Sequence, residues 1–312
     1  MEESVTNPTA SSLLQPGTLW DKTRAKTISA SKCGALRSIE TEYHLIEQDD
    51  IQFVVRTLSN LALKEQAKKK QQQQENKLGK RIDPFLPYEP ELFVGDISTS
   101  HFCLLNKFNV VDNHLLIVTR AFEEQTDLLN LQDFEALWFC MQEIDGLAFF
   151  NGGKIAGASQ RHKHLQLIPL PFLTDEVHLP IGKAIAKINF ADSIETIASF
   201  PFCHAIASLN LSIDVSPQVA AQTMLQKYYV LLNQIYSNTN IHIKQQPGAY
   251  NFLATREWML LVPRIQESYQ NISINSLGFA GSLFVRDRSA LELLKNLTPI
   301  KLLAKVACEK IT

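Results

Sequence analysis

The sequence contains few cysteines, and no two of them form a C-x-x-C motif. The five stand far apart, at Cys33, Cys103, Cys140, Cys203 and Cys308. Structural zinc sites and small disulfide frameworks both use clustered cysteines at short spacings, so this pattern indicates neither of them. Free cysteine is among the most buried residue types, and we therefore expect reduced, mostly buried thiols.

Two further absences concern charge and long apolar runs. The 30 basic and 32 acidic residues give a formal net charge of −2, which indicates neither a nucleic-acid partner nor a membrane surface as partner. No run approaches the roughly 20 apolar residues of a membrane-spanning helix, and no apolar core follows basic residues at the N-terminus. We therefore expect a cytoplasmic protein with no nucleic acid and no membrane as partner.

The composition is that of an ordinary globular chain, and 312 residues can bury a substantial core. Short apolar runs predict strands over 51–58, 101–108, 115–119, 250–254 and 258–262. Apolar residues at three- and four-residue spacing predict helices over 131–148 and about 219–236, with helical patterns also over 13–25 and 291–303. A small-residue turn is expected over 275–281. The polar tract 67–79 predicts a mobile surface loop.

The most informative stretch is 151–171, N-G-G-K-I-A-G-A-S-Q-R-H-K-H-L-Q-L-I-P-L-P. Side chains alternate along a strand, so His162, His164 and Gln166 are expected on one face. Leu165 and Leu167 then pack on the other face. Small residues before this row allow a phosphate to approach the backbone closely. Taken alone, two histidines on a strand could equally be hydrogen-bonded core residues or part of a metal site.

Four stretches together carry a family resemblance. They are L-L-N-K-F at 104–108, N-H-L-L-I-V-T at 113–119, N-G-G-K-I-A-G-A-S-Q-R-H-K-H-L-Q at 151–166 and N-S-L-G-F-A-G at 275–281. The histidine row resembles the histidine-triad superfamily, in the transferase branch, where a glutamine replaces the third histidine. The four stretches in this order resemble the ATP adenylyltransferases, also called diadenosine tetraphosphate phosphorylases.

The resemblance implies a fold and a domain organisation. The expected fold is α/β (α+β), a histidine-triad-like antiparallel sheet with packed helices and N- and C-terminal elaborations. Residues 1–312 would form a single catalytic domain, in which a C-terminal ATP adenylyltransferase segment from about 190 to 312 completes the site.

The resemblance also implies a reaction and a set of site residues. Diadenosine tetraphosphate and phosphate would be converted reversibly to ATP and ADP through an adenylyl group on His164. The main-chain carbonyl of His162 would hold the other ring nitrogen, and Gln166 and Ser159 would act in catalysis. The remaining expected substrate-binding residues are Lys64, Asn106, Lys107, Asn151, Gly157, Ala158, Gln160, Asn275, Ser276, Leu277, Ser282 and Arg286.

The resemblance implies no organic cofactor and no protein metal site. A divalent cation, Mg²⁺, is expected on the polyphosphate. Two alternatives stay open, namely sugar-1-phosphate nucleotidyl transfer on the same fold and a non-catalytic nucleotide-binding protein. The lack of a C-x-x-C motif weakens the first alternative, because some uridylyltransferases with a similar row carry structural zinc.

Overall fold

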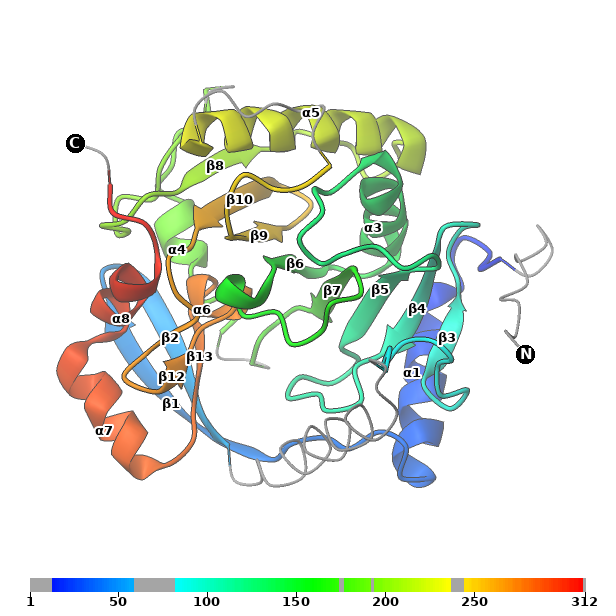
Figure 1. Ribbon diagram of the computed structural model, residues 1–312, viewed down its shortest axis with the longest axis horizontal. Helices are drawn as coiled ribbons and strands as arrows, with labels where there is room; N and C mark the ends of the chain where they lie inside the picture. Colours follow the sequence, from blue (N-terminus) through cyan, green and yellow to red (C-terminus); the bar gives the residue numbers. More distant parts are fainter. Residues whose placement is uncertain (1–12, 59–81, 174–176, 192–193, 237–243, 311–312) are drawn as a thin grey trace.

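A computed structural model describes residues 13–58, 82–173, 177–191, 194–236 and 244–310. Its centre is an eight-stranded sheet in the order β3-β4-β5-β7-β6-β9-β10-β8 (Figure 1). Every neighbouring pair in this sheet is antiparallel. The strands are β3 (Phe93–Asp96), β4 (His101–Leu105), β5 (Leu115–Thr119), β6 (Gly146–Gly152), β7 (His164–Pro169), β8 (Ala205–Ser208), β9 (Tyr250–Ala254) and β10 (Trp258–Pro263). The prediction of an antiparallel-rich α/β fold is confirmed.

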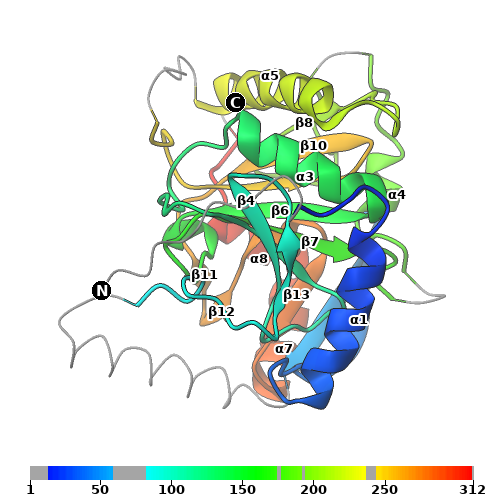
Figure 2. The ribbon, with the colours of Figure 1, turned by 90° about the vertical axis from the view of Figure 1, so that its right-hand side faces the viewer.

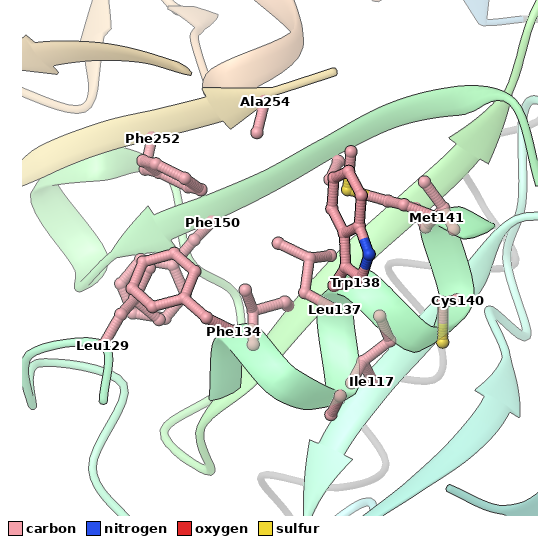
Figure 3. Close-up of a cluster of buried hydrophobic side chains, with 14 of the residues drawn as sticks. Ile117, Leu129, Phe134, Leu137, Trp138, Cys140, Met141, Phe150, Phe252 and Ala254 are labelled. Carbon is pink, nitrogen blue, oxygen red and sulfur yellow. The ribbon is translucent and has the colours of Figure 1, made fainter. Parts of the chain in front are cut away.

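Three helices cover one face of this sheet, as Figures 1 and 2 show: α1 (Leu19–Lys32), α3 (Leu131–Glu143) and α5 (Pro217–Tyr236). Phe134, Leu137 and Trp138 of α3 pack against the sheet beside Phe150 and Phe252 (Figure 3). Removing one such buried aromatic side chain costs about 3–5 kcal/mol. This layer therefore holds the central strands rigidly from behind.

The other face is covered by a smaller sheet and by the C-terminal helices. The small sheet has the order β1 (Thr41–Gln48), β2 (Ile51–Leu58) and β13 (Ser282–Val285). Around it lie α4 (Gly182–Ile185), α6 (Ser276–Phe279), α7 (Arg288–Leu297) and α8 (Pro299–Val306). A short 3₁₀ turn, η2 (Lys154–Ala156), and a β11–β12 pair (Ser268–Tyr269 and Ile272–Ser273) complete the described elements.

The helix predicted over 131–148 is shorter than expected. Asn130 and Asp133 form a capping box at its start, but the backbone is already extended at Ile144 and strand β6 begins at Gly146. Ala148 belongs to that strand, yet it packs in the same core cluster as Met141. A strand facing the same core continued the apolar pattern, and periodicity alone could not mark the boundary.

Four smaller predictions also needed correction. The N-terminal helix spans 19–32 instead of 13–25, and the strand predicted over 101–108 ends at Leu105. The single helical tail over 291–303 is two helices, because the backbone at Thr298 has φ 72° and Pro299 starts α8. Buried thiols were expected, but only Cys103 and Cys140 are buried, and all five cysteines are free.

The polar tract 67–79 and Lys64 lie outside the described residues. Within the described part of the chain, no helix combines the length and the apolar character needed to span a bilayer.

Candidate active site

Strand β7 lies between β5 and β6 in the middle of the large sheet. Leu165 and Leu167 point to the face covered by α3 and α5, as the alternation predicted. His164 and Gln166 point to the opposite face. On that face they lie between two apolar clusters, one containing Phe149 and Ile168 and the other containing Leu116 and Val118. Polar side chains thus occupy a gap between hydrophobic patches.

His164 is 4% exposed, and its ring is held in one tautomer. Its Nδ1–H donates to the carbonyl oxygen of His162 at 2.8 Å, the contact that the family resemblance implies. Burial lowers the pKa of His164 to about 4, although the hydrogen bond to that carbonyl acts to raise it. The ring is therefore neutral at pH 7. Its Nε2 carries a lone pair and has no hydrogen-bond partner among the described residues.

The backbone around His164 is fixed by a residue that the sequence did not indicate. The side-chain oxygen of Gln125 accepts from the His164 N–H at 2.9 Å. Its Nε2 donates to the carbonyl oxygens of Asn151 and His164. One amide therefore ties the histidine row to the end of β6.

His162 lies just before β7 and is buried. Its Nδ1 lies 2.7 Å from a carboxylate oxygen of Asp83, and its Nε2 lies 2.7 Å from the carbonyl oxygen of Thr119. Nε2 also lies 3.0 Å from the Thr119 hydroxyl, so both ring nitrogens have hydrogen-bond partners within the protein. The ring of Phe85 packs edge-on against His162 and His164, with centroids at 5.8 Å and 5.1 Å.

Gln166 takes part in a chain of side-chain hydrogen bonds. Its Oε1 lies 3.0 Å from Nε2 of His114, and Nδ1 of His114 lies 3.2 Å from Nδ2 of Asn106. His114 also packs against Phe149, with ring centroids at 5.8 Å. The structure thus brings the predicted residue Asn106 to Gln166 through a histidine.

Lys163 stands between the two histidines and points to the opposite, helix-covered side. Its ammonium group is fully buried and lies 2.5 Å from a carboxylate oxygen of Asp133 and 3.1 Å from Glu123. Burial acts to raise the pKa of Asp133, but the hydrogen bond from His101 and the charge of Lys163 lower it below its usual value. This buried ion pair anchors the histidine row to helix α3.

The glycine-rich loop 152–160 approaches the C-terminal segment closely. Gly157 has φ +92°, and a Cβ there would lie 2.8 Å from the Ile274 carbonyl oxygen and 2.9 Å from Asn275. The N–H groups of Gly157 and Ala158 donate within the loop. Those of Ser159 and Gln160 have no acceptor among the described residues, and Ser159 is exposed. The family resemblance implies phosphate contacts from Gly157, Ala158, Ser159 and Gln160, but only Ser159 and Gln160 have a backbone N–H group that is not already used within the loop.

Two predicted ligand residues use their side chains inside the protein. Oδ1 of Asn151 accepts from Asn251 Nδ2 at 2.9 Å and from the backbone N–H and hydroxyl of Ser276 at 2.9 Å and 2.8 Å. Arg264, which the sequence analysis missed, donates to Asn251 at 2.5 Å and to the Ile274 carbonyl at 3.0 Å. Burial lowers the pKa of Arg264 to about 10. The network joins the end of β6 to α6.

The other predicted residues are more dispersed. Asn275 caps α6 by accepting from the Leu277 N–H at 3.1 Å. Leu277 and Ser282 are buried, whereas Arg286 is exposed just after β13. Lys107 forms an ion pair with Glu89 at 2.5 Å.

No group of three or more His, Cys, Asp or Glu side chains that could hold a metal ion occurs in the described part of the chain. Both ring nitrogens of His162 face protein acceptors. The side chains of His162 and His164 are therefore held by hydrogen bonds to protein groups.

A central antiparallel strand that presents a neutral imidazole, preceded in the chain by a glycine-rich loop with unused N–H groups among the described residues, is the arrangement expected of a histidine-dependent nucleotidyltransferase. Comparison with known proteins agrees. The family model of the Ap4A (diadenosine tetraphosphate) phosphorylase N-terminal domain matches residues 9–187, and that of the ATP adenylyltransferase C-terminal domain matches 198–309. The chain belongs to this family of Ap4A phosphorylases.

Individual relatives cover most of the chain. Diadenosine 5′,5‴-P1,P4-tetraphosphate phosphorylase 2 of Saccharomyces cerevisiae is 29% identical, over 88% of this chain and 89% of the relative. Protein APA1 of the same yeast is 28% identical, over 66% and 69%. The crystal structure of yeast Ap4A phosphorylase Apa2 in complex with AMP matches with a TM-score of 0.75 and 26% identity, covering 95% of this chain and 98% of that one.

Proposed function

We propose that this protein splits diadenosine tetraphosphate reversibly with phosphate, giving ATP and ADP. The names of its relatives support this substrate, since one is a diadenosine tetraphosphate phosphorylase and another was solved with AMP. The observation that carries the proposal is the state of His164. Its Nδ1–H is held by a carbonyl, and burial keeps the ring neutral at pH 7, so Nε2 carries a lone pair.

The proposed reaction has two displacements. In the first, Nε2 of His164 attacks the α-phosphorus, a P–N bond forms, and the P–O bond to the leaving ATP breaks. In the second, an oxygen of inorganic phosphate attacks the same phosphorus, the P–N bond breaks, and ADP leaves. The His162 carbonyl keeps its hydrogen bond to Nδ1–H throughout and stabilises the positive charge that develops on the ring.

Two parts of the site, Gln166 and the loop before the histidine row, are proposed to bind the phosphoryl oxygens. The amide of Gln166 can donate a hydrogen bond but has no proton to transfer. ATP leaves readily as an anion, so a proton donor is not required. The exposed Ser159 hydroxyl and the N–H groups of Ser159 and Gln160, which have no acceptor in the described ranges, are the proposed anion contacts of the loop. One such donor is worth about 3–4 kcal/mol at a transition state.

Mg²⁺ is proposed to arrive bound to the polyphosphate, as part of the substrate. Mg²⁺ prefers oxygen ligands and usually keeps several waters, with few protein ligands. The carboxylate beside the histidines, Asp83, already accepts from the Phe85 N–H at 2.9 Å and faces His162. A cytoplasmic location stays a prediction.

The test combines product analysis with trapping. The purified protein is incubated with the dinucleotide, phosphate and Mg²⁺, and products are identified by mass. The enzyme is also incubated with dinucleotide labelled in the α-phosphate but without phosphate, to capture adenylyl-enzyme. We expect ATP and ADP from the wild type, and neither turnover nor label from His164→Ala. The variant of exposed His178, His178→Ala, serves as the matched control and should behave like the wild type.

The same assay separates the alternatives. Uridylyl label from a UDP-sugar, with none from the dinucleotide, would favour sugar-phosphate nucleotidyl transfer. Tight nucleotide binding without phosphate-dependent products would favour a binding protein. Phosphorolysis by His164→Ala at the wild-type rate would exclude the covalent mechanism.

A further inference from the structure

We infer that Asn106 and His114 are positioning residues that orient the side-chain amide of Gln166, so that its NH₂ group and not its oxygen faces the phosphoryl group. This inference rests on the proposed function and adds to it how the third residue of the row is held as a donor. The contacts that carry it run from the turn after β4, through the start of β5, to the middle of β7.

The first step fixes the amide of Asn106. The backbone N–H of Phe108 points at this side chain, with its nitrogen 3.3 Å from Oδ1. A backbone N–H can only donate, so the atom it meets must be the amide oxygen. The NH₂ group of Asn106 is therefore the end that lies 3.2 Å from Nδ1 of His114.

The second step fixes the tautomer of His114. An NH₂ group can only donate, so Nδ1 of His114 must present its lone pair. In a neutral imidazole the proton then resides on Nε2. The ring cannot turn over easily, because it is buried and packs against Phe149.

The third step fixes Gln166. Nε2–H of His114 donates over 3.0 Å, and the atom that accepts is Oε1 of Gln166. In the register of β5 and β7, Leu116 is opposite Gln166, and His114 precedes Leu116 by two residues. His114 therefore lies on the same face, diagonally beside Gln166.

Once Oε1 is occupied, the NH₂ group of Gln166 is the end left for a ligand. That group has no acceptor among the described residues. A flipped amide would put a carbonyl oxygen against phosphoryl oxygens and replace an attraction by a repulsion. Three successive hydrogen bonds, donated by the Phe108 N–H, the Asn106 NH₂ group and the His114 Nε2–H, thus orient the Gln166 amide with its NH₂ group toward the ligand.

Asn106→Asp tests this series of hydrogen bonds because it replaces the NH₂ group of Asn106 by a carboxylate oxygen and changes little else. The carboxylate can still accept from the Phe108 N–H, but it cannot donate to His114. Nδ1 of His114 must then gain a proton, and the ring either loses the one on Nε2 or becomes doubly protonated. Asn106→Ala removes the donor without demanding a proton on Nδ1. Asn113→Asp adds the same charge in the same turn and is the matched control.

The measurements are ¹⁵N NMR of histidine-labelled protein, with His114 assigned by comparison with His114→Gln, and kcat for phosphorolysis. We expect the wild type to carry its His114 proton on Nε2 only. In Asn106→Asp, loss of the Nε2 proton should lower kcat on the order of a hundredfold relative to Asn106→Ala. If that variant becomes doubly protonated, kcat should stay near that of Asn106→Ala.

Three outcomes would overturn the inference. They are a wild-type His114 with its proton on Nδ1, a kcat that does not vary with the presence of the His114 Nε2 proton, and a loss of kcat in Asn113→Asp equal to that in Asn106→Asp. A general structural defect would lower the melting temperature and affect Asn106→Ala at least as much as Asn106→Asp. The wild-type rate separates this inference from the proposed function. An inactive wild type refutes the function, while the NMR measurement still decides the tautomer.

Discussion

The buried histidines predict a loss of stability in mild acid, and His204 allows the effect to be isolated. Its side chain is 4% exposed and lies away from the histidine row, just before β8. Nδ1–H donates to the Phe202 carbonyl at 2.8 Å, and Nε2 accepts from the Ile197 N–H at 2.7 Å. Protonation of Nε2 would break the second bond. Burial lowers the pKa of His204 to about 4, from an ordinary value of 6.5.

The sign and the size follow from proton linkage. Between about pH 6.5 and pH 4 the unfolded chain binds a proton at this histidine and the folded chain does not. The free energy of unfolding therefore falls as the pH is lowered through this window. One such histidine accounts for about 2 kcal/mol between about pH 7.5 and pH 5. His164, with the same pKa of about 4, should contribute a similar amount.

The assay is urea unfolding of the wild type and of His204→Gln at both pH values. The variant should be less stable at the higher pH by about 1–3 kcal/mol, because the Ile197 and Phe202 groups lose a partner. The decrease in its free energy of unfolding between the higher and the lower pH should be about 2 kcal/mol smaller than the decrease in the wild type. His178→Gln, at an exposed histidine, should leave the acid loss unchanged. An equal acid loss in the wild type and His204→Gln would refute the reasoning.

Three other substitutions test the support of the site. Gly157→Ala places a Cβ 2.8 Å from a carbonyl oxygen, so the loop must move and kcat/KM should fall at least about tenfold. The control is Gly17→Ala, which is also at positive φ but has no atom within 4 Å of the added Cβ, and its kcat/KM should not fall. Lys163→Met removes the cation beside the fully buried Asp133 carboxylate, which keeps only its contacts with His101 and the Asn130 N–H, so urea unfolding should show a loss of about 3–5 kcal/mol, part of which Asp133→Asn in the same chain should restore. Asp83→Ala removes the acceptor 2.7 Å from His162 and should lower kcat on the order of tenfold; an unchanged kcat would contradict it.

The sequence predicted the parts of the site that depend on local pattern. Alternation along 162–167 was enough to separate the polar face from Leu165 and Leu167, because a strand has a fixed period of two. The hydrogen bond from His164 to the His162 carbonyl was expected from the family resemblance, and it joins residues two positions apart. Both features are set within a few residues of chain.

The contacts that were missed join residues far apart in the chain. Asp83 meets His162 across 79 positions, and Gln125 meets His164 across 39. Neither residue belongs to a motif, and a lone Asp or Gln gives no sign of its partner. Lys163 reads as an ordinary solvated lysine in a polar row, yet it is fully buried because strand alternation turns it toward Asp133. Such pairs are decided by sheet order, which the pattern of one segment does not contain.

The C-terminal segment contacts β6 and the glycine-rich loop, which precede the histidines in the chain. Asn151 lies near the end of β6, and its side-chain oxygen accepts hydrogen bonds from Asn251 and Ser276. Both partners belong to the C-terminal segment that begins at residue 198. Gly157 in turn packs against Asn275 at a distance that excludes any side chain. The loop that leads to His164 is therefore enclosed by residues from both matched family segments. In the proposed reaction the loop N–H groups bind phosphate, and this packing, to which both segments contribute, would hold those groups in place beforehand.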